Sequence, residues 1–361
     1  MRLHAPRTIS RRHVMAAFSL GIALHVAAGC SDPPTSIEDS PGPVRSEIRD
    51  LVGLGGLWAR ARAINDFGRV VGDASLSAST IHAFSWSETG GIRDLGTLGG
   101  ALSAAAAINA QSQIVGWSIT SSGVQHAFLA TAGEAMRDLG TPEGGVASEA
   151  SDINDNGTVV GNWLTATGET RVFAWTQVAG MRDVPGSARY QWVRANAVNV
   201  HGQIAGVGMD RNAGTSLALI WEANGDVREV GTLPGAAESI ALAINADGHV
   251  VGASGVASGA YRAFLWTPSG GMRDLGVLEG MDWSIARDIS DRGHVVGSSG
   301  PSGSTAGRAF LWTESGGMRE LGGFPASDRT ESGAFGVNWY GRTVGYSWNG
   351  SSFRPVIFPD R

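Results

Sequence analysis

The sequence contains no lysine, and charged residues of either sign are sparse. All 27 basic residues are arginine, charged side chains make up 17% of the 361 residues, and the formal net charge is -6. No clustered basic run interrupts this acidic balance. Because contacts to nucleic-acid phosphates need clustered basic side chains, the composition argues against a nucleic-acid partner.

Cysteine is almost absent too, since Cys30 is the only one and no internal disulfide can form. It follows a basic start that ends at Arg12, an apolar stretch over 14–28 and the residues Val-Ala-Ala-Gly. This order predicts that residues 1–29 are an export signal peptide. The residues before Cys30 resemble a bacterial lipobox, and that resemblance implies lipidation of Cys30. An ordinary secretory signal is the alternative, and the sequence leaves both the Sec and the Tat export routes open.

Residues 30–46 are rich in Pro, Ser and acidic side chains, which predicts an extended tether. The apolar stretch over 14–28 is too short to span a bilayer comfortably. The membrane contact that we expect is therefore the Cys30 lipid alone. By the lipoprotein resemblance, Ser31 directly after the cysteine implies sorting to the outer membrane or the cell surface.

Helical periodicity is missing, and so are the common catalytic motifs. No stretch keeps a 3.6-residue apolar period over ten or more residues. No Gly-rich phosphate loop, Gly-x-Ser-x-Gly elbow, His-Glu-x-x-His motif or cysteine pair occurs. Residues 152–157 match the opening of a calcium-binding loop, but Trp163 stands where the bidentate Glu is needed. We therefore expect no metal and no cofactor.

Glycine and tryptophan, by contrast, are plentiful, with 53 and 12 copies. An Ile-Asn element, or a close variant, returns about every 45 residues, and an alanine always stands three residues before its apolar position. The alanines are Ala61, Ala105, Ala150, Ala195, Ala241, Ala286 and Ala334. Each copy holds four short strand patterns that are separated by turns. Seven copies of a four-stranded unit predict an all-β, seven-bladed β-propeller over residues 47–361.

The phase of the repeat predicts how the ring closes. The domain begins with a fourth-type strand over 47–51 and ends with a third-type strand over 353–358. The N-terminal strand would then complete the last blade and remove open edges. The alanines, and the serines two residues before most of them, are explained by crowding of first strands around the central channel.

The segments His82-Ala-Phe84 and His126-Ala-Phe128, followed by Asp-Leu-Gly-Thr, resemble the bacterial extracellular HAF repeat. The resemblance covers about residues 47–361 and implies an extracellular location without an assigned activity. Arginine or leucine replaces the histidine in other copies. A position that accepts His or Arg indicates a cationic brace to an acid on the next strand rather than a catalytic or metal site.

The candidate ligand-binding face comes from the links between fourth and first strands, where the copies disagree. Exposed aromatics together with Arg and acids suit a glycan or a protein partner. The candidates are Trp58, Arg60, Tyr190, Trp192, Arg194, Asp282, Trp283, Arg287, Asp328 and Arg329. Some of these rings could instead cap the seams between blades.

Asp152 and Asp288 are a second candidate, because they stand just before the repeated Ile where most copies have Ala. If they face the channel, they could hold a cation or a polar ligand. The alternative is that each bonds to its own turn or to a neighbouring backbone N–H.

Together these features favour a monomeric, lipid-anchored binding or scaffold module of the cell envelope, with an unknown protein or glycan ligand. The first alternative is an envelope enzyme, a lyase or hydrolase acting on polysaccharide with acids at the channel mouth. The second is a purely structural envelope protein. Enzymatic activity is the less favoured interpretation because no catalytic motif is present.

Overall fold

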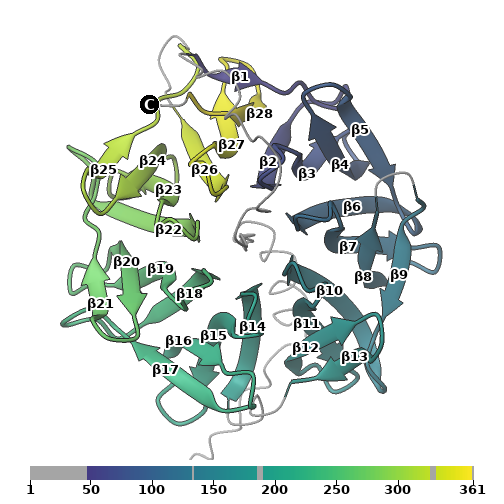
Figure 1. Cartoon of the computed structure of the whole chain (residues 1–361), viewed down its shortest axis with the longest axis horizontal. Coiled ribbons are helices and arrows are strands. Elements are labelled where there is room, and N and C mark those ends of the chain that lie inside the picture. The colour runs from purple at the N-terminus through teal and green to yellow at the C-terminus, as the bar shows by residue number, and fades with distance from the viewer. Residues whose placement is uncertain (1–46, 132–133, 185–189, 326–330, 360–361) are drawn as a thin grey trace, which may run out of the picture.

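A computed structural model describes residues 47–131, 134–184, 190–325 and 331–359 of the chain, and all regular structure in these ranges is β-strand. The strands stand around a central axis in radial groups, so the molecule is a β-propeller (Figure 1). These ranges contain no helix long and apolar enough to cross a membrane. The predicted signal peptide, Cys30 and the tether lie outside the described residues.

Hydrogen bonds join these strands into five four-stranded sheets and one eight-stranded sheet. The sheet that holds both chain ends contains β1 (Arg49–Asp50), β26 (Ser332–Val337), β27 (Thr343–Trp348) and β28 (Phe353–Ile357). The next contains β10 (Gly145–Ile153), β11 (Val159–Thr165), β12 (Thr170–Thr176) and β13 (Gly180–Asp183). A third contains β14 (Tyr190–Val198), β15 (Ile204–Asp210), β16 (Ser216–Trp221) and β17 (Val227–Gly231).

The remaining two four-stranded sheets follow the same order from the centre outward. One contains β18 (Ser239–Ile244), β19 (Val250–Gly255), β20 (Tyr261–Thr267) and β21 (Gly271–Asp274). The other contains β22 (Trp283–Ile289), β23 (Val295–Gly300), β24 (Arg308–Thr313) and β25 (Gly317–Glu320).

The eight-stranded sheet departs from the separate four-stranded sheets that the repeat predicts. It contains β2 (Ala59–Ile64), β3 (Val70–Ser75), β4 (Ile81–Ser87), β5 (Gly91–Gly96), β6 (Gly99–Ile108), β7 (Ile114–Thr120), β8 (Gln125–Ala130) and β9 (Arg137–Gly140). A single parallel pair, Ile81 with Leu102, joins β4 to the long strand β6. Hydrogen bonding alone therefore gives six sheets in the described part of the chain.

The N-terminal strand joins the last sheet, as the phase of the repeat predicts. Arg49 and Asp50 of β1 pair with Ile357 and Val356 of β28. The carboxylate of Asp50 forms an ion pair with Arg354, whose Nε lies 3.0 Å from Asp50 Oδ2. The two ends of the domain thus share one sheet, and the ring has no open end there.

Side chains of the repeat link each sheet to the next. The turn asparagines donate from Nδ2 to a backbone carbonyl of the next turn, for example Asn109 to Asn154 at 3.1 Å. The series closes where Asn338 donates to the carbonyl of Asn65 at 3.3 Å. Ser290 stands where an Asn would otherwise continue it. The turn of the second copy keeps Ser112 at a positive φ of 60°, where other copies have Gly.

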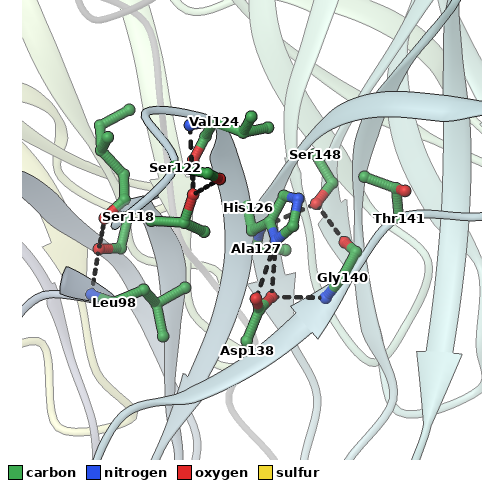
Figure 2. A network of polar contacts seen from close by, with 12 residues as sticks. Leu98, Ser118, Ser122, Val124, His126, Ala127, Asp138, Gly140, Thr141 and Ser148 are labelled. Carbon is green, nitrogen blue, oxygen red and sulfur yellow. Dashed lines mark hydrogen bonds and ion pairs between the residues drawn. The ribbon is translucent and has the colours of Figure 1, made fainter. Parts of the chain in front are cut away.

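The serines two residues before the repeated alanines do more than fill small spaces near the channel. Ser148 Oγ accepts a hydrogen bond from the backbone N–H of Ala127 at 2.9 Å and donates to the carbonyl of Gly140 (Figure 2). Ser239, Ser284 and Ser332 make the equivalent pair of bonds to the preceding sheet, and Ser103 makes it between β6 and the strands β4 and β5 of the eight-stranded sheet. These hydroxyls therefore latch neighbouring sheets, a role that the sequence argument missed.

The aromatic residues of the third strands form the core between sheets. Phe84, Phe128, Phe173, Phe264 and Phe310 are fully buried. Burying one such ring stabilises the fold by about 2–3 kcal/mol. Several third-strand tryptophans also lie under an arginine of the preceding sheet, such as Trp86 under Arg49 at 4.7 Å.

Candidate functional site

Each innermost strand carries a β-bulge directly after the repeated alanine. In β22, Ala286 pairs with Gly297 and Asp288 with Val296, so Arg287 has no partner in the ladder. The other strands skip one residue in the same place. The bulged residues are Arg62, Ala106, Ser151, Asn196, Leu242, Arg287 and Phe335. A bulge re-aims one side chain, and this is the position where the copies differ most in chemistry.

A glycine on the second strand makes each bulge possible. A Cβ at Gly297 would lie 2.0 Å from the carbonyl oxygen of Ile285, and one at Gly161 would lie 2.0 Å from that of Glu149. A Cβ would lie within 2.0 Å of a backbone oxygen at five further glycines as well, namely Gly72, Gly116, Gly206, Gly252 and Gly345. The glycine of the repeated Val-Val-Gly or its variants is therefore fixed by the backbone of the bulged strand.

A cavity of about 440 Å³ opens where the ends of the domain meet, and we call it the closure pocket. Its aromatic wall consists of Trp283, Phe335, Tyr346 and Phe353, with Tyr261 at the edge. Its polar wall consists of Arg60, Arg287, Ser304, Thr305 and Glu331. The pocket draws on residues of β2, β20, β22, β26, β27 and β28 and on the link between β23 and β24. It thus lies on the face that the sequence argument selected.

Arg287 is the distinctive group of the closure pocket. Its guanidinium lies 4.9 Å from the ring centroid of Phe335. Its Nε and Nη1 atoms are shielded from solvent, and they make no hydrogen bond with the described residues. Burial, reinforced by the charges of Arg62 and Arg60 and opposed by Tyr346, lowers the pKa of Arg287 to about 10. The side chain therefore remains a cation at neutral pH, and its Nε–H and Nη1–H have no acceptor in the part of the chain that the structure describes.

The neighbouring arginines are neutralised in part by one carboxylate. Asp73 of β3 pairs with Arg60 at 3.0 Å and with the buried, bulged Arg62. Although burial raises the pKa of Asp73, the charges of Arg62 and Arg60 outweigh it and hold that pKa below its usual value. Arg60 also lies 5.0 Å from the ring of Trp58. The Arg60 side chain is thus positioned by Asp73 and Trp58 together.

Trp283 and Asp282 shape the rim of the pocket. The indole Nε1 of Trp283 donates to the carbonyls of Pro301 and Ser304, both at 3.0 Å. The carboxylate of Asp282 is exposed and accepts the backbone N–H of Ser302 at 2.7 Å. Trp283 and Asp282 hold the link between β23 and β24 in place. Of the two, only Trp283 lines the cavity.

The structure places Tyr190, Trp192 and Arg194 in a different region. Tyr190 is fully buried in the core of its sheet, so it is a packing residue rather than part of an exposed face. Trp192 is half-buried on the same strand. Arg194 donates to Glu149 Oε1 at 2.7 Å. The remaining two candidates, Asp328 and Arg329, lie outside the described residues.

Glu149 and Arg194 belong to a network of satisfied polar groups, which we call the Arg194 network. Its other members are Ser151, Asn162 and the backbone of Ala195. Asn162 Nδ2 donates to Ser151 Oγ at 3.2 Å, and Asn162 Oδ1 accepts the N–H of Ala195 at 2.8 Å. This network joins two sheets and contains no unused cation.

Asp152 and Asp288 follow the structural alternative rather than the ligand-binding one. Asp152 accepts the N–H of Ile153 at 2.8 Å and that of Val198 on the next innermost strand at 2.7 Å. Asp288 accepts the N–H of Ile289 at 2.7 Å and that of Val337 at 2.8 Å. Burial raises the pKa of both carboxyls well above the usual value, although the backbone donors oppose it. Each Asp staples two neighbouring innermost strands.

The histidines of the repeat are braces, as expected. His126 Nδ1 lies 2.9 Å from Asp138 on the adjacent outer strand (Figure 2), and His82 lies 2.8 Å from Asp94 in the same way. Arg308 replaces the histidine in its copy and pairs with Glu320 at 3.2 Å. In the part of the chain that the structure describes, no group of three or more His, Cys, Asp or Glu could hold a metal ion.

Among the residues that line the pocket, sequence reasoning missed Glu331, Phe335, Tyr346 and Phe353, and it also missed Arg62, whose charge acts on Arg287 although Arg62 does not line the pocket. Arg62 and Phe335 stand, like Arg287, between two small residues of the first strand. A varied residue between repeated small ones is therefore the sequence signal that would have found them. The others come from the last sheet, and no spacing within one repeat connects them to β2 or β22.

No protein-family model matches the chain, and no curated protein is similar to it in sequence. Among solved structures, a puromycin hydrolase mutant complexed with PGG has a TM-score of 0.56 at 16% identity, covering 92% of this chain and 55% of that one. The β-propeller domain of the Trilobed protease from Pyrococcus furiosus has a TM-score of 0.55 at 10% identity, covering 83% and 95%.

At these identities the likeness shows the fold alone, which is that of the β-propellers. This chain spans just over half the length of the puromycin hydrolase chain. The Pyrococcus furiosus domain is described as having an open velcro topology. Here, in contrast, β1 pairs with β28.

Proposed function

We propose that this protein is an exported, lipid-anchored β-propeller of the HAF-repeat type that binds a ligand at the cell envelope. The observation that carries the proposal is the closure pocket, which combines aromatic walls with an arginine whose Nε and Nη1 make no hydrogen bond with the described residues. Ligand pockets of proteins are typically concave and mainly apolar, with a few placed polar groups, and have volumes of roughly 300–1,000 Å³. The closure pocket fits this description.

The propeller of this proposal has seven blades. The repeat occurs seven times in the sequence, and the eight-stranded sheet divides at one parallel pair into two antiparallel sets of four strands. Counting those sets as separate blades makes each copy of the repeat one blade.

Location at the envelope rests on the N-terminal sequence, with lipid attached to Cys30. A Cys30→Ala change should abolish labelling by radioactive fatty acid and release the protein from membranes. Unchanged labelling would contradict the anchor. The wild-type protein and a Ser31→Ala variant, labelled in the same way, serve as controls.

An enzyme acting on polysaccharide is less well supported. That alternative needs carboxylates free to act at the channel mouth. Asp152 and Asp288 are the two candidate carboxylates that the sequence suggested. Each uses both carboxylate oxygens to accept backbone N–H groups. Their geometry supports a structural role.

Blocking the pocket tests the proposed function. Thr305 lines the pocket and is exposed on the link between β23 and β24, so Thr305→Trp should fill the cavity without disturbing the core. Ser302→Trp, on the same link but away from the lining, is the matched control. The full-length protein in detergent would be screened against glycan and peptide arrays.

Signals that Thr305→Trp removes and Ser302→Trp retains would support binding at the closure pocket. A set of ligands whose binding is insensitive to both changes would place the site elsewhere. The absence of any signal from the wild-type protein on either array would contradict a binding function for these ligand classes.

A further inference from the structure

The closure pocket holds a positive charge for which the described residues supply no ion-pair partner. Arg287 presents Nε–H and Nη1–H without acceptors among the described residues. Its contact with Phe335 is a cation–π interaction, which uses the face of the ring and supplies no lone pair to those donors. A buried cation without a partner destabilises the folded protein, and such groups mark functional sites.

The charges around Arg287 leave an excess of one positive charge. Arg60, Arg62 and Arg287 stand against Asp73 and Glu331 in the described part of this region. Asp73 is already committed to Arg60 and Arg62. Glu331 lines the pocket and would repel a ligand that carries several negative charges. The balance therefore suits a ligand with a single negative charge better than a phosphate or a polyanion.

A carboxylate is the anion that matches a guanidinium best, because two parallel N–H donors can meet its two oxygens. The aromatic wall offers ring faces to a compact body that has an apolar face. The hydroxyls of Ser304 and Thr305 line the same pocket and can bond to hydroxyl groups. A ring that combines a carboxylate, hydroxyls and an apolar face is an acidic sugar.

We propose that the closure pocket binds a uronic-acid unit of a glycan, with the sugar carboxylate on Arg287 and the sugar ring against Trp283 and Phe335. This proposal rests on the proposed binding function and names its ligand class. Because the pocket lies at the meeting of β2, β22 and β26, only a closed ring assembles it. The cavity of about 440 Å³ takes one or two sugar rings at most.

The test compares an acidic sugar with its neutral counterpart. Full-length protein in detergent would be titrated by calorimetry with digalacturonic acid and with the matched neutral digalactoside. The acidic sugar should bind at least about 10-fold more tightly, because hydrogen bonds to a charged group are stronger than neutral ones. Equal affinity for the two sugars, or no binding of either at millimolar concentration, would overturn the proposal.

Two arginine substitutions then assign the charge. Arg287→Gln should weaken binding of digalacturonic acid by about 10- to 100-fold. Arg194→Gln is the matched control, since Arg194 sits on another innermost strand and already pairs with Glu149. It should leave the affinity unchanged. Circular dichroism and thermal melting of both variants show that each one folds, and equal losses in the two would contradict the role of Arg287.

A peptide arm separates this inference from the proposed function. A short peptide with a free C-terminal carboxylate presents the same anion without the sugar hydroxyls, and its amide lacks the charge. If the free-acid peptide binds in the pocket and digalacturonic acid does not, the binding function stands and the sugar assignment falls. If Thr305→Trp blocks neither ligand, the proposed function falls as well.

Discussion

Arg194 and Arg287 lie on equivalent strands of two sheets, yet their environments are opposite. Arg194 precedes the repeated alanine, stays in the ladder opposite Val207 and donates to Glu149 at 2.7 Å. Arg287 follows the alanine, occupies the bulge and has no ladder partner. A shift along the strand turns a side chain toward another face, and the bulge adds to that turn. The comparison teaches that the scaffold is shared, whereas the site is made by the bulged residue and its surroundings.

The largest predicted effect tests whether the scaffold is the same in both regions. Gly297→Ala beside the closure pocket and Gly161→Ala beside the Arg194 network should each lower the free energy of unfolding by about 3 kcal/mol or more. In both, the new Cβ would lie 2.0 Å from a backbone oxygen. Urea denaturation measures the loss.

Gly255→Ala is the control for that pair. Its Cβ would meet no atom closer than Glu238 O at 3.9 Å, so its effect should be small. A large loss in one region and none in the other would show that the two bulges are not equivalent.

The second prediction compares Arg194, which pairs with Glu149, with Arg287, whose Nε and Nη1 make no hydrogen bond with the described residues. Glu149→Gln should destabilise the protein by about 1–3 kcal/mol, because Arg194 loses a charged acceptor. Arg287→Met should leave the stability unchanged or raise it by about 1 kcal/mol, because it removes a partly buried cation whose shielded Nε and Nη1 have no acceptor among the described residues. Thermal and urea unfolding would be compared. A larger loss for Arg287→Met than for Glu149→Gln would reverse the comparison.

The third prediction concerns Asp152 and Asp288, which occupy the same position in the two regions. Burial raises their folded-state pKa, so the folded protein holds protons that the unfolded chain releases. Their contribution to stability is therefore full below the unfolded pKa of about 3.9 and is lost as the pH rises through the window above it. The slope is at most about 1.4 kcal/mol per pH unit for each group.

Asp152→Asn and Asp288→Asn should each flatten this decline, as measured by urea midpoints between pH 4 and pH 8. The exposed Asp247 provides the control substitution. A slope that changes in only one of the two variants would mean that the local charge of the closure pocket, rather than burial, sets the behaviour.

The smallest effects are expected at the outer braces. His126→Gln, on the sheet next to the Arg194 network, and Arg308→Gln, on the sheet of the closure pocket, should each cost about 0.2–1 kcal/mol. Both ion pairs are partly exposed and lie far from the bulges. Urea midpoints at low and high salt provide the measurement. A loss above about 2 kcal/mol at either site would show that the brace supports more than its own pair of strands.

Much of the fold could be predicted from the spacing of a few residues. The Ile-Asn turns, the spacing of the repeated alanines and the fourth-type strand over 47–51 predicted the strand types, the propeller and the pairing of β1 with β28. The long β6 was not predictable in this way. Its pair with Ile81 depends on where two neighbouring sheets touch, which the pattern of one copy does not encode.

The candidate site was predicted in part. Arg60, Trp283 and Arg287 line the closure pocket, whereas Tyr190 is core and Arg194 belongs to the other region. Exposure was inferred from loop positions, and it failed for Tyr190 because β14 begins earlier than the shorter copies suggest. Phe335 and Arg62 were missed because nothing in one copy reveals that the strand bulges.

The sequence by itself determined the repeat, the four strands of each copy and the residues that fill the core, because these depend on local turns and on apolar spacing. The tertiary structure alone decided which arginine is neutralised. Closing the ring brings residues of β2, β26 and β28 to the same pocket as residues of β22, and the bulges aim Arg62, Arg287 and Phe335 within their strands. Charge balance and burial depend on those distances, which no single repeat contains.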